Sequence, residues 1–144
     1  MSLNNTVVFA QNMADKTTIL RTFNTNFFDF FNEILTIFPN NAGIMTGKNA
    51  FDMAKKANPT ILIKVWHTYI YSRYHDVIDA GDISFFFDKD YNEDLGVLGS
   101  NSKYILEIID SLREPIRIMS DENKAHSMSY IQVLSKLSEV YSKF

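Results

Sequence analysis

Residues 15 to 38 carry the pattern that most limits how this chain can fold. When successive residues are placed 100° apart, the apolar side chains gather on one half of a helical wheel, and Asn24 is the one polar residue among them. An apolar face about 180° wide is broader than one neighbouring helix covers, so we expect a central helix packed against two or three others. Pro39 and the two asparagines after it end the segment. The apolar set is Ile19, Leu20, Phe23, Phe27, Phe28, Phe30, Phe31, Ile34, Leu35, Ile37 and Phe38.

Four further segments have helical periodicity. In the longest of them the arc predicted to be buried holds Leu62, Ile63, Trp66, Tyr69, Ile70, Tyr74, Val77 and Ile78. Capping residues and prolines set the expected limits. We predict helices over 47–57 with Thr46 as N-cap, over 59–80 with Asn58 as N-cap and Gly81 as the stop, over 102–113 broken by Pro115, and after the N-cap Ser120 to the end of the chain.

No segment alternates strongly enough between apolar and polar residues to predict a strand. The sequence therefore predicts an all-α, single-domain bundle of about five helices with a central Phe-rich helix. Residues 15–144 form this domain, and residues 1–14, which are polar and weakly patterned, are predicted to be a flexible N-terminal arm. A chain of 144 residues is long enough to bury a core of its own.

Cysteine is absent, which excludes a disulfide framework, a thiolate zinc site and a cysteine nucleophile. The start of the chain lacks the pattern of a signal peptide, and no apolar run is long enough to span a bilayer. We therefore expect an intracellular protein with no membrane contact, in the cytoplasm.

The net charge of -3 is unevenly distributed. Residues 41–75 hold five cations and one acid, a net of +4, while residues 76–110 hold nine acids and two lysines, a net of -7. Such a field can steer a partner, although a solvated face is the commoner meaning. The basic segment also contains three tyrosines, so association with nucleic acid is an alternative function. Its cations are Lys48, Lys55, Lys56, Lys64 and Arg73.

The pair Gly47-Lys48 suggests a phosphate-binding loop, but the spacing does not fit. The motif G-x-x-x-x-G-K-[ST] needs a glycine where Ala42 stands and a hydroxyl where Asn49 stands. Residues 88–99 begin like a calcium loop, with oxygen-bearing residues at its first, third and fifth positions. Glu93 replaces the required glycine and Gly99 replaces the bidentate glutamate. We therefore predict no cofactor and no metal site.

Histidine and serine patterns give no catalytic arrangement either. His67 and His126 lie at the edges of predicted apolar stripes, where a hydrogen-bonded boundary residue is the usual role. His75 and Asp79 are four apart on a polar helix face, where they could pair or share a metal ion, a surface pair being the commoner outcome. No triad spacing is present, so the sequence predicts no catalytic residue and a protein that is not an enzyme.

Three segments resemble a group of small, uncharacterised α-helical proteins encoded by nucleocytoplasmic large DNA viruses. They are FFDFFNEILTIFPNN, YHDVIDAGDISFFFDKDY and SDENKAHSMSYIQVLSKLSEVY, within residues 22–141. The resemblance implies a viral protein, located in the virion or the host cytoplasm, that serves as a virion component or as a partner of viral or host machinery. It implies no catalytic residue.

The chain is rich in aromatic residues, with twelve phenylalanines, seven tyrosines and one tryptophan. A small bundle can bury only part of them, so the surplus predicts an apolar patch that binds another protein or a second copy. The alternative is that these residues complete the core. The predicted function is a non-enzymatic interaction or structural module. Its candidate interaction residues are Lys48, Lys55, Lys56, Lys64, Arg73, Phe85, Phe86 and Phe87.

Overall fold

A computed structural model describes residues 15–88 and 100–144. These residues form an all-α domain without strands, which confirms the predicted fold class. The predicted arm 1–14 lies outside the described residues. None of the described helices is long and apolar enough to cross a membrane.

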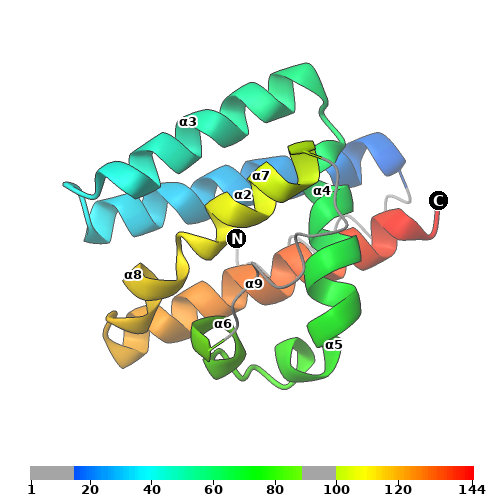
Figure 1. Cartoon of the computed structure of the whole chain (residues 1–144). Helices are drawn as coiled ribbons and strands as arrows, with labels where there is room; N and C mark the ends of the chain where they lie inside the picture. Colours follow the sequence, from blue (N-terminus) through cyan, green and yellow to red (C-terminus); the bar gives the residue numbers. More distant parts are fainter. Residues whose placement is uncertain (1–14, 89–99) are drawn as a thin grey trace.

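The predicted central helix is present as α2 (Lys16–Ile37), with its limits at the expected residues. The Asp15 carboxylate accepts a hydrogen bond from the Thr17 amide at 2.9 Å and so caps the first turn. In Figure 1 α2 runs between α3 and the C-terminal helix α9 (Asp121–Ser142), and it packs against both. Ile37, which the pattern assigned to the core, is 36% exposed because it lies in the last turn.

The second helix is longer than the sequence predicts. α3 (Ala42–Ala57) begins five residues before Gly47, and its N-cap is Asn41 rather than Thr46. The Asn41 side chain accepts a hydrogen bond from the Ile44 amide at 3.1 Å. Gly47 therefore lies inside the helix, where a Cβ atom would stand 2.9 Å from the side chain of Ile108. The glycine permits close packing against another helix, and this packing explains why its low helix propensity is overridden.

The third predicted helix is divided into three parts. α4 (Ile61–Val65) leads into a π-helical segment, η1 (Trp66–Tyr71), and then into α5 (Ser72–Asp79). Asn58 ends α3 as its C-cap, and its Oδ1 also accepts a hydrogen bond from the Thr60 amide at 3.2 Å, so it caps the turn at 59–60 that leads into α4. Gly81 ends the run with φ of 78°, as the sequence predicts.

The backbone hydrogen bonds of the π segment span five residues instead of four, and the one extra residue that this inserts rotates the buried face. Its signature is the hydrogen bond from the Ser72 amide to the His67 carbonyl, five residues back. On a helical wheel of 100° per residue, the centre of the face buried before η1 and the centre of the face buried after it lie about 100° apart. Val65 and Tyr71 are therefore buried although the sequence pattern placed both outside the core arc.

The described residues after position 99 form three helices, α7 (Ser100–Asp110), α8 (Arg113–Arg117) and α9. α7 ends before the predicted residue, and α8 contains Pro115, the residue predicted to break the helix. Proline is tolerated there because the amides of a first helical turn have no partner within the helix. The Ser120 hydroxyl accepts a hydrogen bond from the Asn123 amide at 3.2 Å, so the predicted cap of α9 is confirmed.

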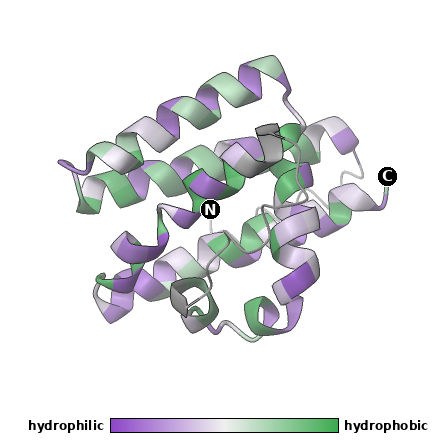
Figure 2. Ribbon diagram, viewed as in Figure 1, coloured by the Kyte–Doolittle hydropathy of each residue, from purple (hydrophilic) through white to green (hydrophobic). Residues whose placement is uncertain are grey.

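Aromatic rings fill the centre of the domain. The ring of Phe27 lies 4.5 Å from that of Phe51, 5.5 Å from Phe31, 5.9 Å from Phe23 and 6.0 Å from Trp66, measured between centroids. All five side chains are buried, with exposures of 0% or 1%. Figure 2 shows hydrophobic residues concentrated on the parts of α2 and α9 that lie inside the bundle. The wide apolar face of α2 is thus covered by three neighbours, α3, α4 and α9.

Candidate functional site

The predicted aromatic patch is largely part of the core. Phe86 is 1% exposed, so the expectation that it belongs to a surface patch is wrong. Phe85 is half-buried and lies 5.5 Å from the ring of Tyr74. Phe85 and Phe86 belong to the short helix α6 (Ser84–Asp88), which packs against α8. The side chain of Phe87 and the predicted calcium loop after Asp88 lie outside the described residues.

The five predicted cations lie on three helices rather than on one continuous patch. Lys48 and Lys55 are half-buried on α3, and Lys55 Nζ lies 5.3 Å from the centre of the Phe28 ring. Lys56 forms an ion pair with Asp52 at 3.0 Å. Lys64 is on α4, and the Arg73 guanidinium on α5 lies 6.0 Å from the Tyr69 ring.

Two clefts open beside the turn that follows α3. One has a volume of about 300 Å³ and includes Lys64 and Tyr69. The other, called the Arg21 cleft below, has a volume of about 210 Å³. Neither lining includes an acidic residue, so both concave surfaces are suited to anionic groups. The Arg21 cleft is lined by Thr17, Leu20, Arg21, Asn24, Thr25, Lys55 and Pro59.

A third hollow lies between α3 and α7. It has a volume of about 190 Å³, and small residues of α3 face Tyr104 and Ile108 across it. Met53 of α3, which follows the lining residue Ala50 by about one helical turn, is 71% exposed, and the lining residue Tyr104 of α7 is 50% exposed. We call this combined surface the α3–α7 face. It is formed by Gly43, Thr46, Gly47, Ala50 and Met53 of α3, by Tyr104, Glu107 and Ile108 of α7, and by Ser111 after it.

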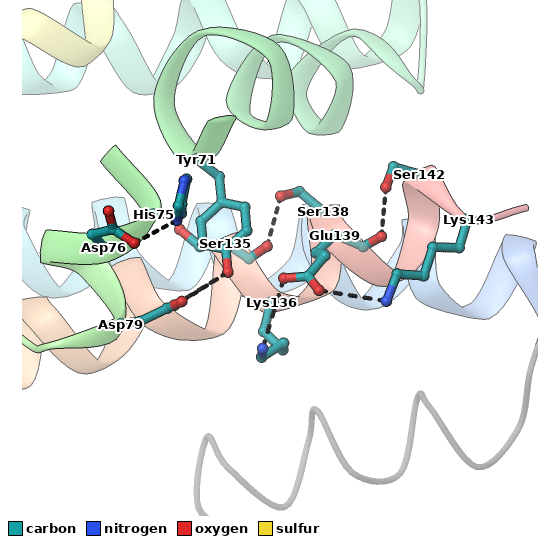
Figure 3. Close-up of polar contacts among 10 residues, drawn as sticks. All are labelled: Tyr71, His75, Asp76, Asp79, Ser135, Lys136, Ser138, Glu139, Ser142 and Lys143. Carbon is teal, nitrogen blue, oxygen red and sulfur yellow. Dashed lines mark hydrogen bonds and ion pairs between the residues drawn. The ribbon is translucent and has the colours of Figure 1, made fainter. Parts of the chain in front are cut away.

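Two titratable groups with shifted pKa values, Tyr71 and Glu139, meet between η1 and α9 (Figure 3). The Tyr71 hydroxyl donates to the Asp79 carboxylate, with O–O distances of 3.1 and 3.2 Å, and Glu139 approaches the same hydroxyl. Burial, followed by the two carboxylates, raises the pKa of Tyr71. The hydrogen bond from Tyr71, helped by Lys136 and Lys143, lowers the pKa of Glu139. A phenol that is harder to ionise is a hydrogen-bond donor, so this cluster fastens η1 to α9 rather than supplying a nucleophile.

The histidines lie apart from one another. His75 Nδ1 pairs with Asp76 at 2.9 Å, so the expected pairing with Asp79 is wrong, because Asp79 binds Tyr71 instead. His126 Nε2 lies 3.0 Å from Glu33. Within residues 15–88 and 100–144, no three histidine or carboxylate side chains gather in a way that could hold a metal ion.

With the geometry described, the chain can be compared with known proteins. No protein-family model, curated protein or solved structure matches it. The resemblance to viral helical proteins therefore stays a prediction, and functional inference rests on the surfaces described above.

Sequence reasoning missed two elements of these surfaces. Gly43, which lines the hollow, was assigned to a loop, because the start of α3 was placed too late. Arg21 stood alone among polar residues of the central helix, far in sequence from the cations at 48–73. Asn24 gave the one available signal, since a polar residue within an apolar arc must find partners when it is buried.

The Tyr71 cluster predicts a pH-dependent stability. The lowered pKa of Glu139 contributes stability above its usual value of 4.5 that is lost as the pH falls further, whereas the raised pKa of Tyr71 contributes stability that is complete below pH 10. Tyr71→Phe should lower the free energy of unfolding by about 1–2 kcal/mol at pH 7. Because protonation of Glu139 removes part of the same interaction, the loss should shrink at pH 3.5. Urea titrations measure both values.

Tyr69→Phe is the matched control, because Tyr69 lies two residues before Tyr71 in η1 and is half-buried, and its ring contacts the Arg73 guanidinium at 6.0 Å. It should change the free energy of unfolding by about 0.5 kcal/mol or less at either pH. A Tyr71→Phe loss that is equal at pH 7 and pH 3.5 would show that the carboxylates are not responsible.

Proposed function

We propose that this protein is a non-enzymatic interaction module and that its α3–α7 face docks on a second copy of the chain. The observation that carries the proposal is the presence of a projection and a hollow on the same face. Met53, 71% exposed, follows Ala50 by about one helical turn, and Ala50 lines a hollow of about 190 Å³. In a twofold dimer each subunit presents the same surface, so that surface must be complementary to itself.

The chemistry of the face supports this assignment. Exposed methionines adapt their shape easily and are common at protein-binding surfaces. α3 lines the hollow with the small residues Gly43, Gly47 and Ala50, and α7 lines it with Tyr104 and Ile108. Glu107 is the single charged residue among those that line it. Pairing two such faces buries apolar surface while bringing few charges together.

The alternative, association with nucleic acid through the cations at 48–73, has less support from the geometry. Tyr71 is 7% exposed, and Tyr69 and Tyr74 pack against the core, so these three rings are poorly placed to stack on bases. Lys56 is already paired with Asp52. A self-associating helical module would also suit a virion component, the role implied by the resemblance to viral proteins.

The proposal is tested by the mass of the protein in solution. Light scattering after gel filtration should give a mass that rises above the monomer as concentration increases. Met53→Glu should shift the dissociation constant at least tenfold toward the monomer, because each dimer would bury two unpaired carboxylates. A wild-type protein that stays monomeric at every concentration would overturn the proposal.

Ile118→Glu provides the matched control. Ile118 is 64% exposed, and it lies after α8, away from the residues of the α3–α7 face. The same charge introduced there should leave the dissociation constant within about twofold. If both variants weakened association equally, the effect would come from net charge and not from the α3–α7 face.

A further inference from the structure

The Arg21 cleft lies between the first turns of α2 and the end of α3, away from the α3–α7 face. Arg21 and Lys55 line it together with the hydroxyl-bearing Thr17 and Thr25, and Leu20 and Pro59 add apolar surface. The N-terminal amides of Thr17 and Thr18 are already bound by Asp15. An anion in this cleft would therefore be held by side chains and not by the end of the helix.

The described residues hold neither cation of the cleft in an ion pair, although Arg21 contributes, after hydrogen bonds from Thr18 and Thr17, to the lowered pKa of the Asp15 carboxylate. Within the part of the chain that the structure describes, the ion pairs include neither Arg21 nor Lys55. The contrast with the next residue is sharp, because Lys56 is paired with Asp52 at 3.0 Å. The Phe28 ring, 5.3 Å from Lys55 Nζ, restrains the ammonium group at the edge of α2.

The side-chain amide of Asn24, at the cleft, has an oxygen that accepts no hydrogen bond from the described residues. Asn24 is 5% exposed, and its Nδ2 donates to the Pro59 carbonyl at 3.1 Å. Its Oδ1 is buried and has no hydrogen-bond partner among the described residues. A buried acceptor without a donor destabilises the folded protein, because it has lost its hydrogen bonds to water and gained none in return. A ligand that carries a hydroxyl next to its anionic group can supply that donor once the Asn24 side chain adjusts.

We propose that the Arg21 cleft binds a small phosphate monoester that bears a free hydroxyl. A guanidinium matches two phosphate oxygens at once, and an ammonium group adds a second charge-assisted contact. The volume of about 210 Å³ accommodates a phosphate with a few carbon atoms. The apolar side chains of Leu20 and Pro59 contact those carbons, and the threonine hydroxyls surround the remaining polar atoms.

Isothermal titration calorimetry of the full chain with glycerol 3-phosphate, at constant ionic strength, tests the proposal. Saturable binding to one site per chain is expected, together with a rise in melting temperature. Arg21→Gln and Lys55→Gln should each weaken binding about tenfold or more, since each removes a charge-assisted hydrogen bond. Absence of saturable binding to the wild-type protein would overturn the proposal without recourse to any variant.

Lys56→Gln is the matched control, because it removes the same charge one residue away from Lys55 and outside the cleft. It should leave the affinity within about twofold. Inorganic phosphate should bind several-fold more weakly than glycerol 3-phosphate, and equal binding would overturn the role of the hydroxyl. A single-stranded oligonucleotide should bind more weakly than glycerol 3-phosphate. If it binds more tightly, and if Lys56→Gln and Lys55→Gln lower its affinity equally, the binding site is an extended nucleic-acid surface and not the cleft.

Discussion

Phe27→Ala should lower the free energy of unfolding by about 3–5 kcal/mol. The Phe27 ring touches rings from α2, α3 and η1 at once, so its removal leaves a cavity that no single helix can close. A domain of this size is stable by about 5–15 kcal/mol, so the variant should lose a large part of its stability. Equilibrium urea unfolding, followed by circular dichroism, measures the difference.

The adjacent residue provides the control. Phe28 is half-buried at the edge of the same helix, and Phe28→Ala should cost about 1–2 kcal/mol because less apolar surface leaves the core. Equal losses for Phe27→Ala and Phe28→Ala would mean that the centre of the core lies elsewhere than among these rings.

The central helix was predictable because several signals agree on it. Asp15 is a cap, Pro39 is a stop, and the apolar residues between them keep one phase. The start of α3 was not predictable in the same way, because Gly47 has a low helix propensity and Thr46 is a plausible cap. The partner that makes a glycine favourable there, Ile108, lies 61 positions further along the chain.

The residues of the two proposed surfaces could be predicted from the sequence to different degrees. Lys55 and Lys64 were expected at a surface and do line clefts. Arg21 and Lys55 line the same cleft because α2 packs along α3. The sequence does not reveal such a contact between residues that are far apart in the chain. The α3–α7 face depends on the same kind of packing, between Gly47 and Ile108. Local pattern thus predicted which helices form, whereas the clefts arise from how pairs of helices meet.

Deletion of Thr68 should leave the protein folded, with a change in the free energy of unfolding of about 2 kcal/mol or less. Thr68 is an exposed residue of η1, and η1 contains one residue in excess of an α-helix. Removing it should convert the segment to an ordinary α-helix. The buried residues on either side would keep their faces, so Trp66 should still reach Ser135, to which its indole N–H donates at 2.9 Å.

Deletion of Ser129 is the corresponding change in a regular helix. Ser129 is also exposed, but α9 has no extra residue to lose, so every residue after it would turn by about 100° relative to those before it. Leu134 and Leu137, both 0% exposed, would leave the core, and cooperative unfolding should disappear. Thermal scans of the two deletions separate these outcomes. Equal damage from both would mean that the π geometry of η1 is itself required for folding, and that Trp66 and Tyr71 reach α9 only through it.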